Sequence, residues 1–503
     1  MKKNAILFLL LLLPLSVPLF LNGGLTARAD SQPAAFNPAD WNGKKISAVT
    51  GTIFDQIILD NIPGAVPTYF NNNADGLEAL KNGKIDAIID DDAAVRLYAA
   101  KNPRLKMLEP FVTTDNYAVV AAKGNDALLA QLNAFIAQIK SDGTYDDMLK
   151  RWLDTADPPP MPAITEGGGA TLNFATSGIV DGFSYYKDGE INGFDVEFAK
   201  RFASYADMKL NITIMDFGAL IPSVQSGKSD FAASLFTVTD ERKKSINFTD
   251  PYYTGGAAIA VYDAEAAAVQ KDTFWSRLET SFQNNLIKEN RWTMLLSGLE
   301  ISIVITVFAF ILATLLGFGV CGLRMSGNPV LNFIGNLYVT VFRGTPLVVL
   351  LMIVYYIIFG KISISGTIVA IIAFGVNGAA FIGEIIRTSI LTIDKGQVEA
   401  ARSMGFSKAG AFFTVTFPQA VRTGFPVYMS EFISMFKMTS VVGYIAILDL
   451  TKAGDIIRSR TYDAFFPLIV VALVYLIVSS LLVWLFNLIN RKTNKRLRRG
   501  LKG

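Results

Sequence analysis

The length of the apolar runs along the chain changes near residue 290. Residues 31–290 mix short apolar runs with polar stretches, whereas residues 298–490 contain apolar runs long enough to cross a bilayer, which takes about 20 residues. We therefore predict a soluble part followed by an all-α domain of five transmembrane helices over residues 293–490. The predicted spans are Ile301–Leu323, Gly344–Gly360 with an earlier helix start, Ile362–Gly383, Phe425–Leu448 and Ala464–Asn490.

The N-terminus has the pattern of a secretory signal. MKKNAILFLLLLLPLSVPLFL joins a basic start to an apolar core, and ARA precedes Asp30. We expect residues 1–29 to be removed after Ala29; the alternative is an uncleaved anchor helix. Either outcome delivers residues 30–290 outside the cytoplasm.

The positions of the basic residues predict how the spans are oriented in the membrane. With residues 30–290 outside, Arg324, the loop 387–422 and the tail 491–503 fall in the cytoplasm, and the tail holds seven Lys or Arg. This agrees with the positive-inside rule and predicts a multi-pass protein of the cytoplasmic (inner) membrane, with a cytoplasmic C-terminus. Lys452, Arg458 and Arg460 are exceptions, because they fall outside.

The segment 266–292 is a predicted linker with a helix. Phe274, Leu278, Phe282 and Leu286 are four residues apart, which gives one apolar helical face. We expect this helix to lie along the outer membrane interface. A small helix packed on the soluble part is the alternative.

Composition excludes some chemistry. The chain has no His and a single cysteine, Cys321, so it has no intrachain disulfide and no Cys/His metal site. We predict neither a metal site nor catalytic residues. The net charge of +3 gives no reason to expect nucleic acid binding.

The loop between predicted spans three and four is a polar helical hairpin. Asp394 and Ser407 are N-cap candidates, and Gly405 is a stop between the two helices. Glu399-Ala400-Ala401, Gly405 and the later VTFP resemble, in type and spacing, the EAA loop of type I ABC importer permeases. That resemblance implies that the loop docks on a cytoplasmic ATPase dimer.

Two further stretches resemble polar amino-acid permeases. They are FRGTP at residues 342–346 and SEFISMFKMTSVVGYIAILDL at residues 430–450. In the second, Lys437 is costly inside an apolar span unless it is paired or hydrated, which makes it a functional or helix-pairing candidate. Glu431 lies six residues away and so does not share its helical face.

No P-loop is present, since Gly227-Lys228-Ser229 has Pro222 at the position of the first glycine. The chain is therefore predicted to be a transporter subunit rather than an enzyme. ATP and magnesium would belong to the partner ATPase, and no cofactor to this chain. Five spans per chain imply two copies per transporter, as a homodimer or as a heterodimer with another permease.

Residues 171–265 resemble the first lobe of an amino-acid-binding protein of the periplasmic two-lobed type, which implies an extracytoplasmic α/β fold. The motifs are GFDV at 193–196, DFGALIPSVQSGKSD at 216–230 and TVTDERKK at 237–244. The resemblance implies that Arg242 binds the ligand carboxylate and that Thr237 donates a hydroxyl to it. Independently, a guanidinium group matches a carboxylate with two parallel hydrogen bonds.

Residues 30–155 resemble the second half of the same family. Thr50, Gly51 and Thr52 follow a strand and offer hydroxyl and N–H groups to an anion. The resemblance assigns Asp91 to the ligand ammonium group, with Asp92 as the neighbouring alternative. Asp90 is better explained as a solvated strand end, because successive strand side chains face opposite ways. Residues 116–125 look like the return crossover, and the helices after them are expected to pack on the first lobe.

The two halves occur in reversed order, joined by the Pro- and Gly-rich linker 156–170. We predict one circularly permuted domain, because two truncated domains would expose broken cores. Exchange of halves between two chains is the alternative. We also expect the first lobe to carry the tether to the membrane and the second lobe to swing.

The resemblance implies an importer for polar amino acids. Phe217, Val180 and Phe183 are expected to line the side-chain pocket. Ser177 occupies a position where binders of basic amino acids often have an acid, which favours glutamine or glutamate. A ligand-gated channel or a sensor with the same binding domain is the alternative.

Overall fold

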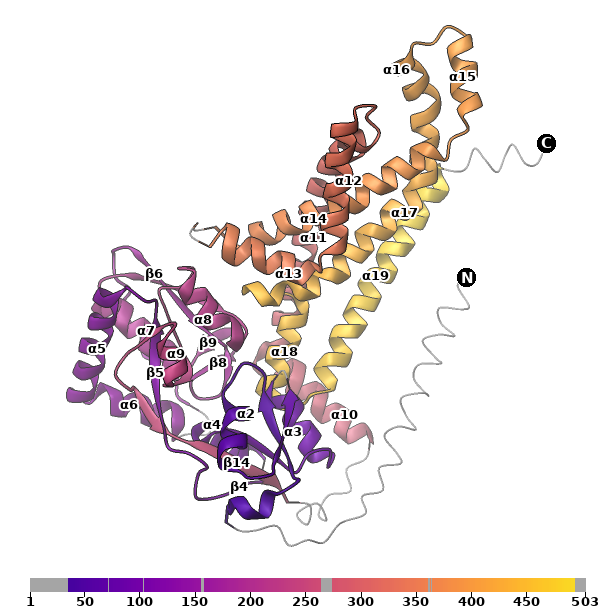
Figure 1. The fold of residues 1–503 in the computed structure, drawn as a ribbon. Coiled ribbons are helices and arrows are strands. Elements are labelled where there is room, and N and C mark those ends of the chain that lie inside the picture. Colours follow the sequence, from indigo (N-terminus) through magenta and orange to yellow (C-terminus); the bar gives the residue numbers. More distant parts are fainter. Residues whose placement is uncertain are drawn as a thin grey trace.

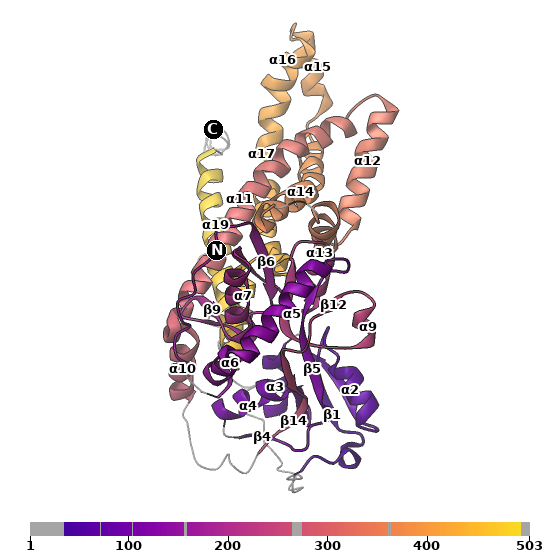
Figure 2. The ribbon, with the colours of Figure 1, turned by 90° about the vertical axis from the view of Figure 1, so that its left-hand side faces the viewer.

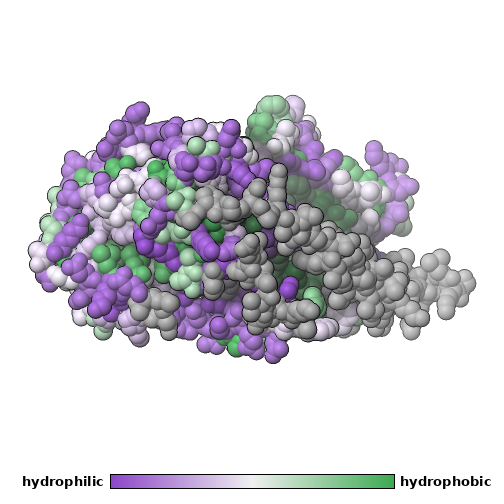
Figure 3. Space-filling model, turned by 90° about the horizontal axis from the view of Figure 1, so that it is seen from below, coloured by the Kyte–Doolittle hydropathy of each residue, from purple (hydrophilic) through white to green (hydrophobic). Residues whose placement is uncertain are grey.

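The computed structural model describes residues 35–70, 72–102, 104–154, 158–263, 274–360, 362 and 364–493. The predicted signal segment 1–29 lies outside these residues, as does the end of the basic tail. The described chain forms an α/β part with two lobes and a helical part beside it (Figure 1). The surface seen from the α/β end is mostly hydrophilic, with scattered apolar patches (Figure 3).

The second lobe is built on a five-stranded sheet with the order β2-β1-β3-β14-β4. Helix α2 covers one face, and α3 and α4 cover the other, so the central strands are apolar on both sides. The elements are β1 (Lys45–Val49), α2 (Phe54–Asn61), β2 (Val66–Phe70), α3 (Asn73–Lys81), β3 (Ala87–Asp91), α4 (Asp92–Lys101), β4 (Leu105–Met107) and β14 (Ala257–Tyr262).

The first lobe is built on a sheet with the order β10-β6-β11-β5-β12, and β13 also pairs with β5. Helices α5, α6 and α7 pack on one face, and α8 packs on the other. The elements are β5 (Asp115–Ala121), α5 (Asp126–Ser141), α6 (Thr144–Leu153), β6 (Thr171–Thr176), α7 (Phe194–Tyr205), β10 (Lys209–Ile214), α8 (Phe217–Gln225), β11 (Phe231–Thr237), α9 (Asp240–Lys243), β12 (Asn247–Phe248) and β13 (Tyr253–Gly255). A small sheet of β7 (Ile179–Val180), β8 (Ser184–Lys187) and β9 (Glu190–Asn192) completes this lobe.

Each lobe contains segments from both sides of the linker. Strand β5 pairs antiparallel with β11, and β14 pairs antiparallel with β3, so the halves complete one another within a single chain. The expectation that α5 and α6 pack on the first lobe is confirmed. The expectation that the first lobe carries the tether is wrong, because β14, the last strand before the helical part, belongs to the second-lobe sheet.

The described part of the linker, residues 158–170, lies on the first lobe. It connects α6 to β6, both elements of that lobe, and its glycines bond to the turn after α7. Gly169 donates its N–H to the Asp207 carbonyl at 2.9 Å, and Gly168 donates to the Asp207 carboxylate at 2.9 Å. A side chain at Gly167 or Gly169 would collide with the Asp207 backbone, which accounts for the glycine run.

Three helices of the helical part are long and apolar enough to cross a membrane, and two bent pairs raise the number to five if each pair is one span, among the residues described. The predicted span Gly344–Gly360 is not one straight helix, because its chain bends by 103° between Pro329–Gly344 and Leu347–Ile358. Pro346 lies in the break and Thr345 before it is extended, as the residue before proline prefers. The helices are α11 (Arg291–Arg324), α12 (Pro329–Gly344), α13 (Leu347–Met352), α14 (Gly366–Leu391), α17 (Phe417–Met438), α18 (Leu450–Thr461) and α19 (Phe466–Thr493).

Helices α11 and α14 form the centre of the helical part, where small residues allow close approach. A Cβ on Gly317 would lie 3.1 Å from the Gly383 backbone nitrogen, and one on Gly378 would lie 3.0 Å from the Ala313 side chain. By contrast, Phe274, Leu278 and Phe282 of α10 (Phe274–Phe282) are exposed. The placement of α10 at a membrane interface stays a prediction.

The helical hairpin and the α/β part lie at opposite ends of the molecule (Figure 1). The hairpin consists of α15 (Lys395–Ser403) and α16 (Lys408–Ala411). Helix α18 lies at the other end, between the helical bundle and the two lobes, and contacts both (Figures 1 and 2).

Candidate functional site

A cavity of about 60 Å³ lies between the two lobes. It collects residues from β1, α2, α3 and β3 of the second lobe and from β7, α8, β11 and α9 of the first lobe. Its polar lining is Thr52, Asn73, Asp90, Asp91, Ser177, Ser234, Thr237 and Arg242, and its apolar lining is Val49, Ile53, Phe54, Ile179, Val180, Phe217 and Leu235. Six of the nine predicted substrate-binding residues line this cavity: Thr52, Asp91, Val180, Phe217, Thr237 and Arg242.

Arg242 is held on the short helix α9, just after β11. The hydroxyl of Thr239 caps this helix by accepting the Arg242 backbone N–H at 3.2 Å. The guanidinium group donates to the Thr237 carbonyl at 3.3 Å and lies 5.9 Å from the Phe217 ring centroid. Burial lowers the pKa of Arg242, and the charge of Asp91 opposes that shift, so the two groups act on each other across the cavity.

Asp91 ends β3 and is buried. It accepts a hydrogen bond from the Tyr117 hydroxyl of the first lobe at 2.5 Å, so it joins the two lobes. Burial raises the pKa of Asp91 well above its ordinary value, and the charge of Asp90 adds to that effect. A cation in the cavity would favour the charged carboxylate again, as an ammonium group requires.

Asp90 is not a solvated strand end, contrary to the sequence prediction. It is 5% exposed, lines the cavity and accepts hydrogen bonds from the Tyr98 hydroxyl at 2.7 Å and the Asn73 amide at 2.6 Å. Burial raises its pKa to about 6. Because the cavity lies at the carboxyl end of β3, side chains from both faces of the strand reach it.

Asp92, the alternative to Asp91, does not line the cavity. It begins α4 and accepts the Gly256 N–H at 3.2 Å, and it lies 3.6 Å from Arg96. Asp92 therefore holds β3 to β14.

An irregularity in β11 aims side chains into the cavity. The register shifts between Ala232 and Phe236, and Leu235 adopts a left-handed conformation with φ of 52°. Ser234 then donates to the Ser177 hydroxyl at 2.8 Å. Bulges of this kind often re-aim side chains beside functional sites.

Three predicted residues do not line the cavity. Phe183 is fully buried in the first-lobe core, where it packs on Phe194 and Tyr253. Thr50 donates both its N–H and its hydroxyl to the Phe70 carbonyl. The prediction that the N–H groups of residues 50–52 bind an anion is therefore wrong for Thr50, and also for Thr52, whose N–H donates to Val49.

Gly51 has a different role, because it faces the other lobe. A Cβ built on Gly51 would lie 3.4 Å from the Gly218 Cα at the start of α8, and its φ of 88° favours glycine. The two lobes thus meet at Gly51 and Gly218, as they do at Asp91 and Tyr117. This is the geometry of closed lobes around a small cavity.

Sequence reasoning missed Asn73 and Ser234 as lining residues. Asn73 begins α3, three positions after the last residue of β2, so its place after a strand was a usable signal. Ser234 had no such signal, since only the irregularity in β11 turns it inward.

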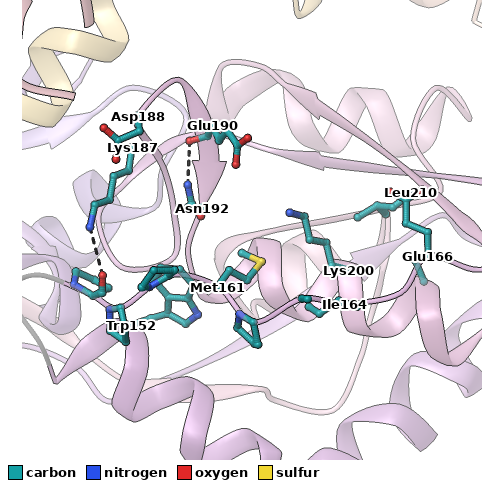
Figure 4. Close-up of a pocket in the computed structure, with 16 residues that line it drawn as sticks. Trp152, Met161, Ile164, Glu166, Lys187, Asp188, Glu190, Asn192, Lys200 and Leu210 are labelled. Atoms are coloured by element: carbon teal, nitrogen blue, oxygen red, sulfur yellow. Dashed lines mark hydrogen bonds between the residues drawn. The ribbon is translucent and has the colours of Figure 1, made fainter. Parts of the chain in front are cut away.

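A second cavity, of about 470 Å³, lies between the linker and the first lobe (Figure 4). None of the predicted site residues lines it. Lys187 spans it at one end, donating to the Pro158 carbonyl at 3.3 Å, while Lys200 and Glu190 project from α7 and β9.

The hairpin has the local structure that the sequence predicts. Asp394 accepts the Gly396 N–H at 2.6 Å, Ser407 accepts the Gly410 N–H at 3.0 Å, and Gly405 has φ of 93°. Glu399 and Ala400 are exposed and Ala401 is buried. The hairpin thus presents Glu399 on a surface at the end of the molecule farthest from the lobes (Figure 1).

Lys437 is exposed on α17, and Glu431, six residues earlier, is partly buried. No hydrogen bond or ion pair joins these two described side chains, in keeping with their spacing.

Comparison with known proteins assigns both parts of the chain. The bacterial extracellular solute-binding proteins, family 3, match residues 66–155 and 172–495. The putative glutamine transport system permease protein GlnP of Rickettsia typhi is 32% identical over 202 residues, which are 39% of this chain and 92% of that protein. The L-cystine transport system permease protein TcyB of Bacillus subtilis is 32% identical over 220 residues, which are 43% of this chain and 94% of that protein.

A solved structure of an amino acid ABC transporter with histidines has 31% sequence identity and a TM-score of 0.39, and the match covers 44% of this chain and all of that one. The lobes, the helical bundle, the family match and the two permease relatives agree with the two resemblances in the sequence. The chain belongs to the bacterial extracellular solute-binding proteins, family 3, and it joins a solute-binding domain of that family to an amino-acid ABC transporter permease.

Proposed function

We propose that the chain is the fused substrate-binding and permease subunit of an ABC importer for polar amino acids. The observation that carries this proposal is that Arg242 and Asp91, from different lobes, line one cavity. Arg242 would bind the α-carboxylate and Asp91 the α-ammonium group. A ligand that bridges the two charges stabilises the closed lobes, which couples binding to closure.

The substrate that the cavity supports best is glutamine. Among the described residues that line it, Arg242 is the one cation, while Asp90 adds a second carboxylate. A glutamate side chain would meet that carboxylate without a counter-charge. Glutamine would instead find neutral hydroxyl and amide partners in Ser177, Ser234 and Asn73. The permease of Rickettsia typhi, named for glutamine transport, supports the same class.

The energy source would be a separate ATPase dimer. The exposed Glu399 on the capped hairpin is the proposed contact, with Ala400, Ala401 and Gly405 shaping it. We further propose that two copies of this chain form one transporter, that residues 1–29 are a signal peptide, and that the lobes are extracytoplasmic and the C-terminus cytoplasmic. A ligand-gated channel or sensor is not favoured, because the permease relatives match over nearly their whole length.

We also propose that the binding domain is circularly permuted. Its support is the pairing of β5 with β11 and of β14 with β3 inside one chain. A purified fragment of residues 30–265 tests this. A monomer that binds amino acid supports permutation, whereas an obligate dimer indicates exchange of halves between chains.

Equilibrium binding to the full chain in lipid nanodiscs tests the function. Labelled L-glutamine is titrated and then competed with a panel of amino acids, beside an Arg242→Ala variant. Lys243→Ala is the matched control, because Lys243 follows Arg242 on α9 but pairs with the exposed Asp240. Saturable binding that Arg242→Ala abolishes and Lys243→Ala keeps supports the proposal. Equal binding by all three proteins would contradict it.

A further inference from the structure

Helix α18 and the residue after it join the two lobes at a buried aspartate. Asp181 of the first lobe is 4% exposed. It accepts hydrogen bonds from Arg460 at 2.6 Å and from the Tyr462 hydroxyl at 2.5 Å. Both residues belong to the helical part of the chain, which we call the permease segment. Lys101 of the second lobe pairs with the same carboxylate. We call these four residues the Asp181 junction.

The junction lies on the seam between the lobes. Asp181 is followed by Gly182, where a Cβ would lie 2.9 Å from Leu97 of α4 in the second lobe. The Tyr462 ring packs edge-on against Tyr98 of α4 with centroids 4.8 Å apart, while its hydroxyl reaches Asp181. Tyr462 therefore contacts both lobes at once.

Two short paths connect the junction to the ligand cavity. On the first lobe, Val180 lines the cavity and is the direct neighbour of Asp181. On the second lobe, Asp90 lines the cavity and accepts the Tyr98 hydroxyl, and Tyr98 packs on Tyr462. Opening of the lobes would separate Lys101 from Asp181 and pull Tyr462 from one of its partners.

A cation from the permease segment helps to compensate the buried negative charge of Asp181. Burial raises the pKa of Asp181, but Lys101 and Arg460 outweigh that effect and hold it below its ordinary value. Arg460 is itself held by Glu289 at 3.2 Å, just before α11. Without Arg460 and Tyr462, Asp181 would keep one cation for a fully buried charge, which is a costly arrangement.

The backbone supports a fixed role for Tyr462. It has φ of 54°, a left-handed conformation that is uncommon for a residue other than glycine. Its N–H donates to Arg458 at 2.8 Å, and its carbonyl accepts Lys81 of the second lobe at 3.2 Å. Such conformations persist where the surroundings over-determine them, often at switch regions.

We propose that the Asp181 junction is a latch by which the permease segment holds the two lobes closed, so that the docked domain binds amino acid more tightly than it would without α18. The coupling is reciprocal, so amino acid in the cavity must also strengthen docking on α18. Arg460 and Tyr462 are then positioning residues for ligand affinity, although neither lines the cavity. This inference rests on the proposed amino-acid binding for its affinity readout.

The test measures labelled L-glutamine binding to the full chain in nanodiscs for Tyr462→Phe and Arg460→Gln. Loss of one charge-assisted hydrogen bond should raise the Kd roughly tenfold and leave maximal binding unchanged. Lys452→Gln is the matched control, because Lys452 of α18 pairs with Asp216 of the first lobe alone, and its Kd should change less than twofold. Unchanged Kd values in both junction variants, or an equal change in all three variants, would overturn the latch.

A second measurement needs no ligand and so separates failure of the latch from failure of the amino-acid assignment. Spin labels at Asp60→Cys and Asp142→Cys, exposed positions on different lobes, report the separation of the lobes in a Cys321→Ser chain. Tyr462→Phe should shift the distance distribution towards longer values in the absence of amino acid, and Lys452→Gln should not. Identical distributions in the three chains would refute the latch whatever the substrate is.

Discussion

The ligand cavity and the helical hairpin are both small groups of functional candidates, but they are assembled in different ways. In the cavity, Asp91 and Arg242 are 151 positions apart in the sequence and meet only when the two lobes close. In the hairpin, Asp394, Gly405 and Ser407 act within one turn of their own position. The cavity depends on long-range folding, and the hairpin depends on local backbone chemistry.

The difference decides how strongly each region responds to substitution. The ionisable side chains of the cavity are the buried Asp90 and Asp91 and the partly buried Arg242, so removal of one of them leaves another without its compensating partner. The hairpin side chains are mostly exposed to solvent, where a single capping or surface interaction is worth about 1 kcal/mol or less. Substitutions should therefore have large effects in the cavity and small effects in the hairpin.

Asp91→Asn should have the largest effect. The variant keeps an oxygen to accept the Tyr117 hydroxyl but loses the charge that faces the ligand ammonium group. We expect L-glutamine affinity to fall at least about 100-fold, or about 3 kcal/mol. Asp92→Asn is the control, since Asp92 does not line the cavity. Equal loss in both variants would indicate a general defect in β3 rather than loss of a ligand contact.

Asp195→Asn extends the contrast to a buried carboxylate outside the cavity. Asp195 accepts the Tyr252 hydroxyl at 2.9 Å, its second oxygen has no partner among the described residues, and burial raises its pKa to about 7. Because the pKa is raised in the folded state, the Asp195 carboxyl makes its full contribution to the free energy of unfolding below about pH 4. That contribution is lost as the pH rises to about 7.

The variant cannot ionise, so this loss should disappear. Asp90 and Asp91 also have raised pKa values and titrate in both chains, so we compare slopes. From pH 5 to pH 8 the free energy of unfolding should fall by roughly 2 to 3 kcal/mol more in the unmodified chain than in Asp195→Asn. Thermal melts followed by tryptophan fluorescence at the two pH values measure the difference. Parallel pH profiles would show that Asp195 stays ionised in the fold.

Glu399→Gln addresses the hairpin. The side chain is exposed on α15, so we expect unchanged glutamine affinity and only a roughly fivefold drop in ATP-driven uptake, as befits one interface contact of about 1 kcal/mol. Uptake of labelled glutamine by cells that carry the variant measures this. Lys395→Gln on the same helix is the control. A fall in glutamine affinity would contradict the proposed role of Glu399 in coupling to the ATPase.

Local signals predicted the hairpin fully and the cavity in part. Caps and a glycine stop have fixed chemistry, so Asp394, Gly405 and Ser407 could be assigned from sequence alone. Arg242, Thr237 and Asp91 came from resemblance to a family, since nothing in the sequence brings residues 151 positions apart together. The return of residues 116–125 to the first lobe was predicted. The prediction that the first lobe carries the tether was wrong, because the chain crosses from β13 of the first lobe to β14, which joins the sheet of the second lobe.

The remaining errors have physical causes that a linear pattern does not contain. Phe183 lies three residues from Val180, yet a tight turn directs it into the core instead of the cavity. The Thr50 and Thr52 N–H groups were already used by neighbouring carbonyls. The bend at Pro346 depends on one residue within an apolar run whose length alone indicated a straight span.

The smallest expected effect is that of Asp394→Ala, and it tests the local side of the contrast most directly. The lost cap bond to Gly396 should cost about 1 kcal/mol of local helix stability. Backbone amides of residues 395–403 should then exchange roughly fivefold faster, measured by hydrogen exchange on the full chain. Ser407→Ala should affect only residues 408–411, because it caps the other helix. If either variant accelerated exchange in the lobes or changed glutamine affinity, the hairpin would be coupled to the cavity through the whole helical part and the division between local and long-range regions would fail.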